Sequence, residues 1–149
     1  MLKFSLCLLL QIFLGLSACS ESPQPAPREF TIIWGSGGGF TGFAEGYILH
    51  SNGAIEKWSG PYFRRDRIQP LGRVPAASLD SLRQLLAAHD WRQVRHRETG
   101  NMTTSLWVIS GKDTAIMSWN GITPGKEAPA ALQELYHRLS QGAASAVRE

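Results

Sequence analysis

The sequence predicts an α+β fold, in which an antiparallel β-sheet of about five strands carries two helices packed on one face. Two hairpin signals and two amphipathic segments support this prediction. The hairpins turn at Asn52-Gly53 and at residues 111–113, and the helices lie at residues 78–89 and 130–139. The resulting order is βββ-α-ββ-α, and the short connections within each group of strands favour antiparallel pairing.

The first group of strands is expected at residues 30–34, 44–50 and 54–58. β-branched and aromatic residues recur in these segments, as is typical of strands. Asn52-Gly53 supplies the positive φ angles of a type I′ hairpin between the second and third strands. Residues 62–68 then either continue the sheet or form a ribbon along its edge.

The second hairpin is expected to pair residues 103–110 with residues 114–119. Both faces of its first strand are apolar, with Leu106 and Val108 on one and Trp107 and Ile109 on the other. This pattern indicates a central strand, or a sheet whose second face is covered by its own aromatic side chains.

Each expected helix carries its apolar side chains on one stripe. In the first they are Leu79, Leu82, Leu85 and Leu86, and in the second Leu132, Leu135, Tyr136 and Leu139. Ser78 is the expected N-cap of the first helix. Gly142 is expected to end the second helix, so the folded domain would span residues 30–141 and residues 142–149 would form a frayed tail.

Residues 1–18 have the features of a bacterial lipoprotein signal peptide. A short basic start precedes an apolar run that is too short to span a bilayer comfortably and that ends at small residues. Leu16-Ser17-Ala18-Cys19 resembles the lipobox, where the signal is cut before a cysteine that receives lipid. The resemblance implies that Cys19 is a lipidated N-terminus, whereas the alternative is an ordinary secretory signal with an incidental cysteine.

The expected location is the cell envelope, with the outer membrane favoured over the inner membrane. An aspartate after the lipidated cysteine would resemble an inner-membrane retention signal, and this chain has Ser20 there instead. Residues 19–29 contain prolines at alternate positions and no large aliphatic residue, which predicts an extended, semi-rigid tether. The expected membrane contact is therefore made through the N-terminal lipid.

Cysteine content argues against thiol chemistry in the folded domain, and the net charge argues against a nucleic-acid partner. Removal of residues 1–18 takes away Cys7, so Cys19 is the one cysteine left and the folded domain contains no thiol. No disulfide, thiolate metal site or cysteine nucleophile is therefore expected. The formal net charge falls from +3 to +2 with the loss of Lys3, which is too small to indicate a nucleic-acid partner.

A glycine-rich stretch at residues 35–42 connects the first two expected strands. It formally matches the dinucleotide-binding glycine pattern, but that motif requires a helix next, and residues 44–50 have the pattern of a strand. The sharper hypothesis is a ribbon that contacts another protein, formed by Ser36, Gly37, Gly38, Gly39, Phe40, Thr41 and Gly42. In the alternative, Phe40 or Phe43 or both fold into the core, and the glycines permit close packing.

No catalytic residue, metal site or cofactor is expected. The histidines are scattered singly, as His50, His89, His96 and His137, and none belongs to an H-x-x-x-H or H-E-x-x-H motif. Ser36 lacks the G-x-S-x-G context of an activated serine. The carboxylates Glu45, Glu56, Asp66, Glu98 and Asp113 fall on hairpins or loops and form no assignable acid–base pair.

Arginines cluster in two segments, residues 64–73 and residues 92–97. If the two segments are neighbours, they form a basic patch that could face anionic lipid headgroups or an acidic protein. The alternative, which is the favoured one, is that they are charged edges that resist pairing with other chains.

The domain resembles a group of small bacterial lipoproteins. The matching features are residues 35–42, Tyr47, Asn52-Gly53, Trp58, residues 100–103, Trp119 and Leu135-Tyr136-x-x-Leu139. A fainter similarity links residues 36–42 to the Ser-Gly-Gly-Phe-Ala-Gly run of emfourin-type inhibitors of thermolysin-like metalloproteases. This chain departs from that run by an inserted glycine and by a threonine in place of the alanine.

The function expected from these observations is that of a membrane-anchored lipoprotein with a non-catalytic, protein-binding domain. The first alternative, which the second resemblance implies, is a peptidase inhibitor that uses the ribbon of residues 37–42, so the protein partner would be a peptidase. A hydrolase or metal-dependent enzyme is the third possibility.

Overall fold

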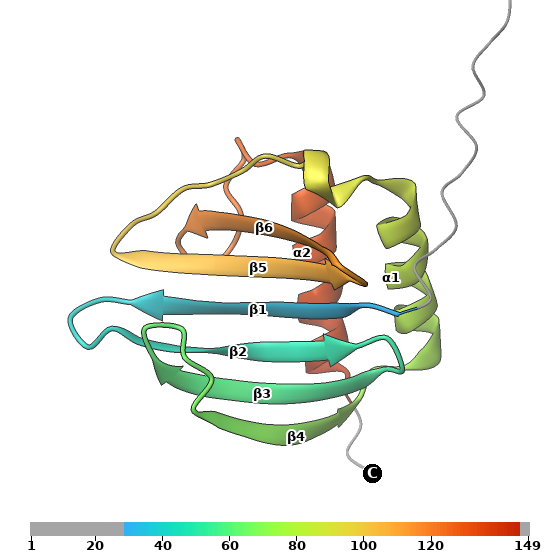
Figure 1. The fold of residues 1–149 in the computed structure, drawn as a ribbon, viewed down its shortest axis with the longest axis horizontal. Coiled ribbons are helices and arrows are strands. Elements are labelled where there is room, and N and C mark those ends of the chain that lie inside the picture. The colour runs from blue at the N-terminus through green and yellow to red at the C-terminus, as the bar shows by residue number, and fades with distance from the viewer. Residues whose placement is uncertain (1–28, 147–149) are drawn as a thin grey trace, which may run out of the picture.

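A computed structural model describes residues 29–146 of the chain (Figure 1). Its strands are β1 (Thr31–Gly38), β2 (Phe43–His50), β3 (Ala54–Pro61), β4 (Arg67–Arg73), β5 (Met102–Ser110) and β6 (Asp113–Asn120). The helices are α1 (Ala76–Ala88) and α2 (Ala130–Ala144), and a short 3₁₀ helix, η1, spans Trp91–Gln93.

The strands form one antiparallel sheet in the order β4-β3-β2-β1-β5-β6. β1 lies at the centre and pairs along its whole length with β2 on one side and with β5 on the other. The predicted α+β fold is confirmed, with six strands in place of about five. The additional strand is β4, which follows the loop at residues 62–66 and runs along one edge of the sheet.

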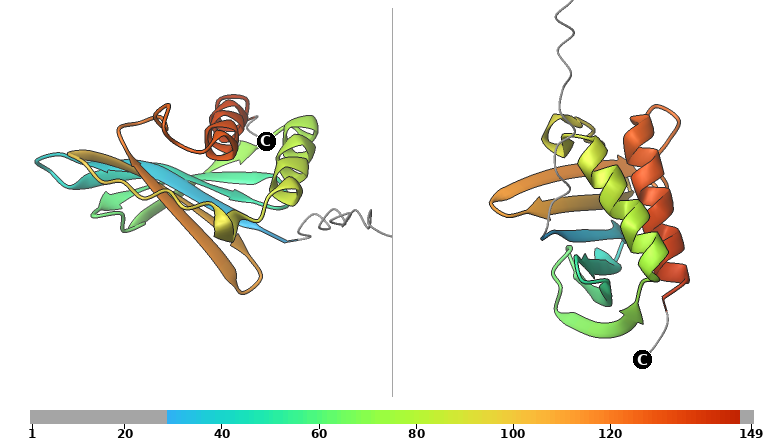
Figure 2. Two further views of the ribbon diagram at one scale, coloured as in Figure 1. Left: turned by 90° about the horizontal axis from the view of Figure 1, so that it is seen from above. Right: turned by 90° about the vertical axis from the view of Figure 1, so that its right-hand side faces the viewer.

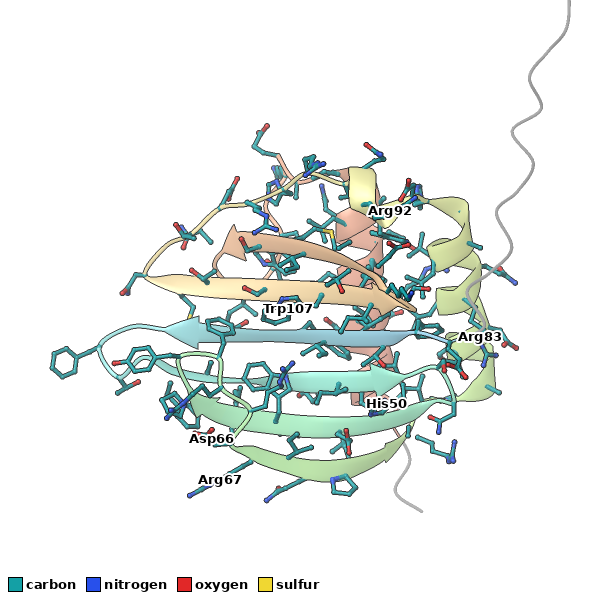
Figure 3. The ribbon with its side chains drawn as sticks, viewed as in Figure 1. His50, Asp66, Arg67, Arg83, Arg92 and Trp107 are labelled. Atoms are coloured by element: carbon teal, nitrogen blue, oxygen red, sulfur yellow. The ribbon has the colours of Figure 1, made fainter. Side chains whose placement is uncertain are left out.

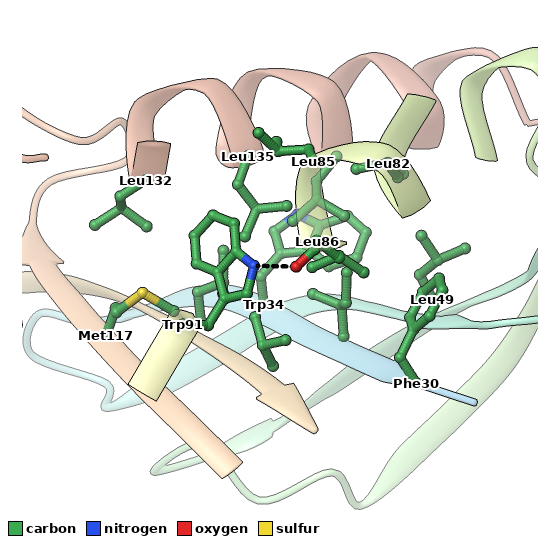
Figure 4. Close-up of a cluster of buried hydrophobic side chains, with 14 of the residues drawn as sticks. Phe30, Trp34, Leu49, Leu82, Leu85, Leu86, Trp91, Met117, Leu132 and Leu135 are labelled. Atoms are coloured by element: carbon green, nitrogen blue, oxygen red, sulfur yellow. Dashed lines mark hydrogen bonds between the residues drawn. The ribbon is translucent and has the colours of Figure 1, made fainter. Parts of the chain in front are cut away.

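Both helices pack on the same face of the sheet (Figure 2), as predicted. Their buried leucines meet the inward side chains of the strands, among them Trp34, Leu106, Met117 and Trp119. Figure 4 shows this main core, in which the indole nitrogen of Trp91 donates a hydrogen bond of 3.2 Å to the carbonyl oxygen of Leu86. This bond ties the buried Trp91 side chain to the last turn of α1.

The helix boundaries differ from the predicted ones. Pro75 stands at the N-cap of α1, so the helix begins before Ser78, and no side chain caps it. Proline is well suited to the start of a helix because its φ angle is already helical and no partner for an N–H group is needed. Ser78 is therefore not the N-cap.

Gly142 does not end the second helix, which continues to Ala144. Gly142 is buried, and a Cβ atom at this position would lie 3.4 Å from a methyl group of Val74. This distance is an ordinary van der Waals contact, and the backbone of Gly142 does not adopt the positive φ angle that typically ends a helix at glycine. The predicted frayed tail is therefore wrong for residues 142–144, while residues 147–149 lie outside the described part of the chain.

The second face of the sheet has a small core of its own, built from Ile33, Ala44, Ile48 and Trp58. Phe63, from the loop between β3 and β4, packs on this face against the rings of Trp58 and Trp107. The strand β5 accordingly buries Leu106 and Val108 beneath the helices, while Trp107 and Ile109 pack on the opposite face. The prediction that both faces of this strand are apolar is confirmed.

The two arginine clusters lie at opposite edges of the sheet (Figure 3). Arg67 and Arg73 bound β4 at one edge. Arg92 lies in η1 beside β6, and Arg97 forms an isolated bridge to Ser118 of β6 at the other edge. The two clusters therefore do not combine into one basic patch, and the alternative of two charged edges fits the topology.

Candidate functional site: the apolar tip of the sheet

The predicted ribbon divides into two parts with different roles. Ser36, Gly37 and Gly38 belong to β1 and pair with both neighbouring strands. Gly39, Phe40, Thr41 and Gly42 form the turn between β1 and β2, which protrudes at one end of the sheet (Figure 1). Only the turn is therefore available as a projecting contact element.

Ser36 is tied into the structure through Thr104. The two hydroxyl oxygens are 2.6 Å apart, and Thr104 also lies 2.6 Å from the carbonyl oxygen of Gly121. A carbonyl can only accept, so Thr104 donates to Gly121, and the Ser36 hydroxyl donates to Thr104. This chain of hydrogen bonds holds the loop after β6 against the centre of the sheet.

Gly37 and Gly38 are required by close packing. A Cβ atom on Gly37 would lie 2.3 Å from the Cβ of Ala44, inside any allowed contact. Gly38 has φ of 135°, and a Cβ there would lie 2.3 Å from the carbonyl oxygen of Asn101. In this half of the stretch the glycines serve packing, as the alternative interpretation predicted.

The turn is fixed at its base and open at its apex. Gly39 and Gly42 have positive φ angles of 65° and 61°. Gly39 donates its backbone N–H to the carbonyl of Asn101 at 2.7 Å, and the N–H of Tyr62 donates to the carbonyl of Gly42 at 2.7 Å. Phe40, at the apex, is fully exposed. Two neighbouring segments thus position the turn while leaving its aromatic ring in solvent.

Five large apolar side chains are exposed at this end of the sheet, and we call them the apolar tip: Phe40, Phe43, Tyr62, Met102 and Ile122. The backbone connects them, because Gly38 pairs with both Phe43 and Met102 and the loop carrying Ile122 is bonded to Met102 through Gly121. Phe43 is 51% exposed, so neither phenylalanine is buried in a core. The alternative that at least one of them is buried is wrong.

Tyr62 and the next residue, Phe63, both have positive φ angles, 52° and 60°. This conformation is strained for bulky side chains and typically costs about 1–3 kcal/mol per residue. With this backbone conformation the two side chains lie in different surroundings. Phe63 packs against Trp58 and Trp107, while Tyr62 is 79% exposed at the tip.

A groove of about 440 Å³ lies beside the tip, between the sheet and α2. Its lining includes Trp34, Tyr47, Lys57, Met102, Ile122 and Tyr136. The ammonium of Lys57 lies 2.9 Å from the carboxylate of Glu45, and this hydrogen bond raises the pKa of Lys57. Partial burial raises the pKa of the Tyr136 phenol. The groove thus combines aromatic walls with one ion pair.

The histidines nearest to carboxylates lie in separate pairs on different strands and loops. His50 lies 3.0 Å from Glu56, and His96 lies 3.7 Å from Glu98. Within residues 29–146, no three histidine, cysteine, aspartate or glutamate side chains are grouped so that they could hold a metal ion. The prediction that the domain is not catalytic stays a prediction.

Cys19, the signal peptide at residues 1–18 and nearly all of the tether at residues 19–29 lie outside the described residues. The lipidation prediction therefore stays a prediction. In the part of the chain that is described, neither helix has the length and apolar character needed to cross a bilayer.

Sequence reasoning singled out Phe40 and Phe43 but missed the other members of the apolar tip. Tyr62 and Ile122 lie in loops, and Met102 lies at the first position of a strand. No local periodicity marks such residues. They lie near one another only because the β1–β2 turn, the loop after β3, the start of β5 and the loop after β6 come together at one end of the sheet. The positive φ of Tyr62 likewise has no signal in the sequence.

Comparison with known proteins adds no family to this description. No family model matches the chain, and no curated protein matches it in sequence. Fold and surface therefore define the protein only as a class: an α+β domain with two helices on one face of a sheet and an exposed apolar tip.

Proposed function

We propose that the chain is a lipid-anchored protein of the bacterial cell envelope whose folded domain binds another protein through the apolar tip. The observation that carries the proposal is the Phe40 ring, fully exposed on a turn whose base is held by Asn101 and Tyr62. Contiguous exposed apolar side chains mark interaction surfaces in soluble domains. A positioned turn also loses little conformational freedom on binding.

The position of the tip in the sheet is compatible with a protein partner for an anchored domain. The first described residue, Glu29, joins the sheet where β1 begins, and β1 runs from there toward the turn (Figure 1). Eight residues of strand cover about 25 Å at roughly 3.3 Å per residue. The tip therefore lies at the end of β1 opposite to Glu29, the residue through which the chain leads to Cys19.

A peptidase is the second candidate as partner, with the domain acting as an inhibitor through residues 37–42. The observation that favours it is the shape of the turn, a narrow projection with one aromatic side chain at its apex and a fixed base. Such a projection suits insertion into a cleft. The resemblance to emfourin-type inhibitors motivates the choice of a thermolysin-like enzyme as the test protease.

Site-specific photo-cross-linking in intact cells tests the protein-binding proposal. A photoreactive phenylalanine analogue replaces Phe40 in the full chain, and a matched control places it at Lys112 in the hairpin at the opposite end of the sheet. We expect a discrete protein adduct from position 40 and none from position 112. Absence of an adduct at position 40, or the same adducts from both positions, would contradict the proposal.

The inhibitor alternative is tested separately with the full chain in detergent micelles. A thermolysin-like protease is assayed on a small fluorogenic substrate with increasing amounts of the wild type or of the F40S variant. Inhibition that is lost in F40S supports the alternative. Full protease activity at every concentration rejects this enzyme class and leaves the cross-linking result to decide the broader proposal.

A further inference from the structure

The outer edge of β6 is only partly covered. The backbone N–H of Ser118 donates to the carbonyl of His96 at 3.0 Å, and the N–H of Glu98 donates to the carbonyl of Ser118 at 2.9 Å. Arg97 thereby forms a short parallel bridge with Ser118. This covers one end of the edge and shows that the edge accepts a neighbouring extended segment.

The remaining part of the edge presents free backbone groups. In a strand, alternate residues direct their N–H and C=O groups to the same side, so Ile116 and Thr114 face outward as Ser118 does. Among residues 29–146, no backbone or side-chain hydrogen bond from another segment reaches these groups of Thr114 or Ile116. Two donors and two acceptors are thus available to an added strand.

The opposite edge of the sheet lacks this property. Pro70 lies within β4 and has no N–H group, and the pairing of β4 with β3 shifts register between Ile55 and Glu56. Proline and irregular pairing are features that block strand addition. The β6 edge, in contrast, has no proline and pairs with β5 in continuous register.

A groove of about 550 Å³ lies along the free part of the β6 edge. The chain from Trp91 to Arg97 forms one wall, and residues 114–116 of β6 form the other. The groove is therefore lined by Thr114 and Ile116, the two residues whose backbone groups lie on the outer side of β6.

The lining of this groove is basic. It includes Arg92, Arg95 and Arg97 and no carboxylate. Arg92 is already paired, with Asp90 at 3.0 Å and Asp113 at 3.6 Å. Arg95 and Arg97 are exposed, and no ion pair joins either of them to a carboxylate within the described residues. Two uncompensated guanidinium groups thus border the free edge.

We propose that the β6 edge at Thr114–Ile116 binds an extended acidic peptide segment as an added strand, with Arg95 and Arg97 pairing its carboxylates. Main-chain hydrogen bonds to Thr114 and Ile116 supply the alignment, as in other cases of strand addition. Carboxylates are the complementary charge, and arginine binds them in a two-pronged geometry. This site is separate from the apolar tip and does not depend on the function proposed for it.

Fluorescence anisotropy with the full chain in detergent micelles tests the proposal. The probes are a labelled peptide of alternating glutamate and valine and a second peptide of alternating lysine and valine. We expect saturable binding of the glutamate peptide, weakening with added salt, and none of the lysine peptide. Equal binding of the two peptides, or no binding of the glutamate peptide, would overturn the proposal.

Two sets of variants test the two kinds of contact. The R95A/R97A pair is expected to weaken glutamate-peptide binding about tenfold, while the matched pair R65A/R67A at the β4 edge leaves it unchanged. Ile116→Pro removes one outward N–H and should weaken binding about fivefold to tenfold, whereas Ile116→Val should not. Unchanged affinity in both R95A/R97A and Ile116→Pro would refute the site.

Backbone-methylated peptides test the main-chain hydrogen bonds to β6 without changing the protein, so they can be used if Ile116→Pro fails to fold. Methylation of alternate amide nitrogens is made in two frames, because only one frame of an added strand faces β6. We expect one frame to lose binding by about tenfold and the other to retain it. Equal affinities in both frames would show a purely electrostatic contact and would overturn strand addition. The F40S variant should bind the peptide normally, which separates this site from the apolar tip.

Discussion

The hydroxyl oxygens of Ser36 and Thr104 lie 2.6 Å apart on the adjacent central strands β1 and β5. Through Thr104, which is fully buried, the hydrogen bonds continue to Gly121 in the loop after β6. This loop carries Ile122, so the same contacts that join β1 to β5 also position one side of the apolar tip. Ser36 therefore acts as a structural residue and not as a free hydroxyl at the surface.

Replacement of Thr104 with valine is expected to destabilise the fold by about 1–3 kcal/mol. Valine has nearly the same shape but leaves the Ser36 hydroxyl and the Gly121 carbonyl without their partner. Urea unfolding followed by tryptophan fluorescence measures the change. Thr114→Val, at an exposed position of β6, is the control and should change stability by less than about 0.5 kcal/mol. Equal stability of the two variants would mean that the hydrogen-bond chain contributes nothing.

Gly35→Ala is expected to cost about 1–3 kcal/mol through overpacking. An added Cβ would lie 2.4 Å from the ring of Trp58 and 2.5 Å from the carbonyl oxygen of Glu45, so the indole would have to leave its place on the sheet. Thermal unfolding monitors stability, and near-ultraviolet circular dichroism monitors the tryptophan environment. Gly125→Ala is the control, because a Cβ there meets no atom within 4 Å. Identical melting of both variants would contradict this explanation of Gly35.

Much of the fold was predictable because periodicity encodes it. The leucine stripes located both helices, and Asn52-Gly53 located a hairpin. The helix ends were predicted less well, because Pro75 stands in place of a side-chain cap and Gly142 lies inside α2 instead of after it. Glycine favours a helix end when it adopts a positive φ angle, and Gly142 does not adopt one, so α2 continues to Ala144.

The candidate sites were predictable only in part. The glycine pattern identified the turn that carries Phe40, but it did not divide the stretch into packed strand and open turn. That division depends on Ala44 and Asn101, which are brought close by strand pairing. The free β6 edge likewise arises from sheet order, since nothing in residues 114–116 alone marks them as an edge.

The Glu45–Lys57 pair beside the apolar tip gives a pH prediction. Its hydrogen bond and charge raise the pKa of Lys57 in the folded state. The stabilisation is therefore fully present below the pKa of unfolded lysine, about 10.4, and is lost as pH rises through the higher folded value. Both side chains are largely exposed, so the pair contributes no more than about 1 kcal/mol.

Glu45→Gln should lower the pKa of Lys57 toward its ordinary value, and NMR titration of the Lys57 side chain measures this. Glu98→Gln, which removes a carboxylate at the opposite edge of the sheet, is the control and should leave the pKa of Lys57 unchanged. If Lys57 titrates at the same pH in the wild type and in Glu45→Gln, the pair does not persist in solution.

Phe40→Ser is expected to separate stability from binding. The Phe40 ring is fully exposed, so its removal should change the free energy of unfolding by less than about 0.5 kcal/mol. The same substitution removes the apex of the apolar tip, so the yield of partner cross-linked through an analogue placed at Phe43 should fall several-fold. Urea unfolding and quantitative immunoblotting of the adduct measure the two effects.

The matched control is Phe63→Ser, because Phe63 is an aromatic residue that packs on the sheet, whereas Phe40 is exposed. Phe63 packs between Trp58 and Trp107 at ring distances of 6.2 Å and 6.4 Å, so its loss should reduce stability by about 1–3 kcal/mol. Stability loss in Phe40→Ser comparable to that in Phe63→Ser would show that Phe40 packs in solution. Undiminished cross-linking in a stable Phe40→Ser protein would instead remove Phe40 from the binding surface. Retained stability with lost cross-linking is the result that an exposed contact residue requires, because such a residue contributes to the complex and not to the fold.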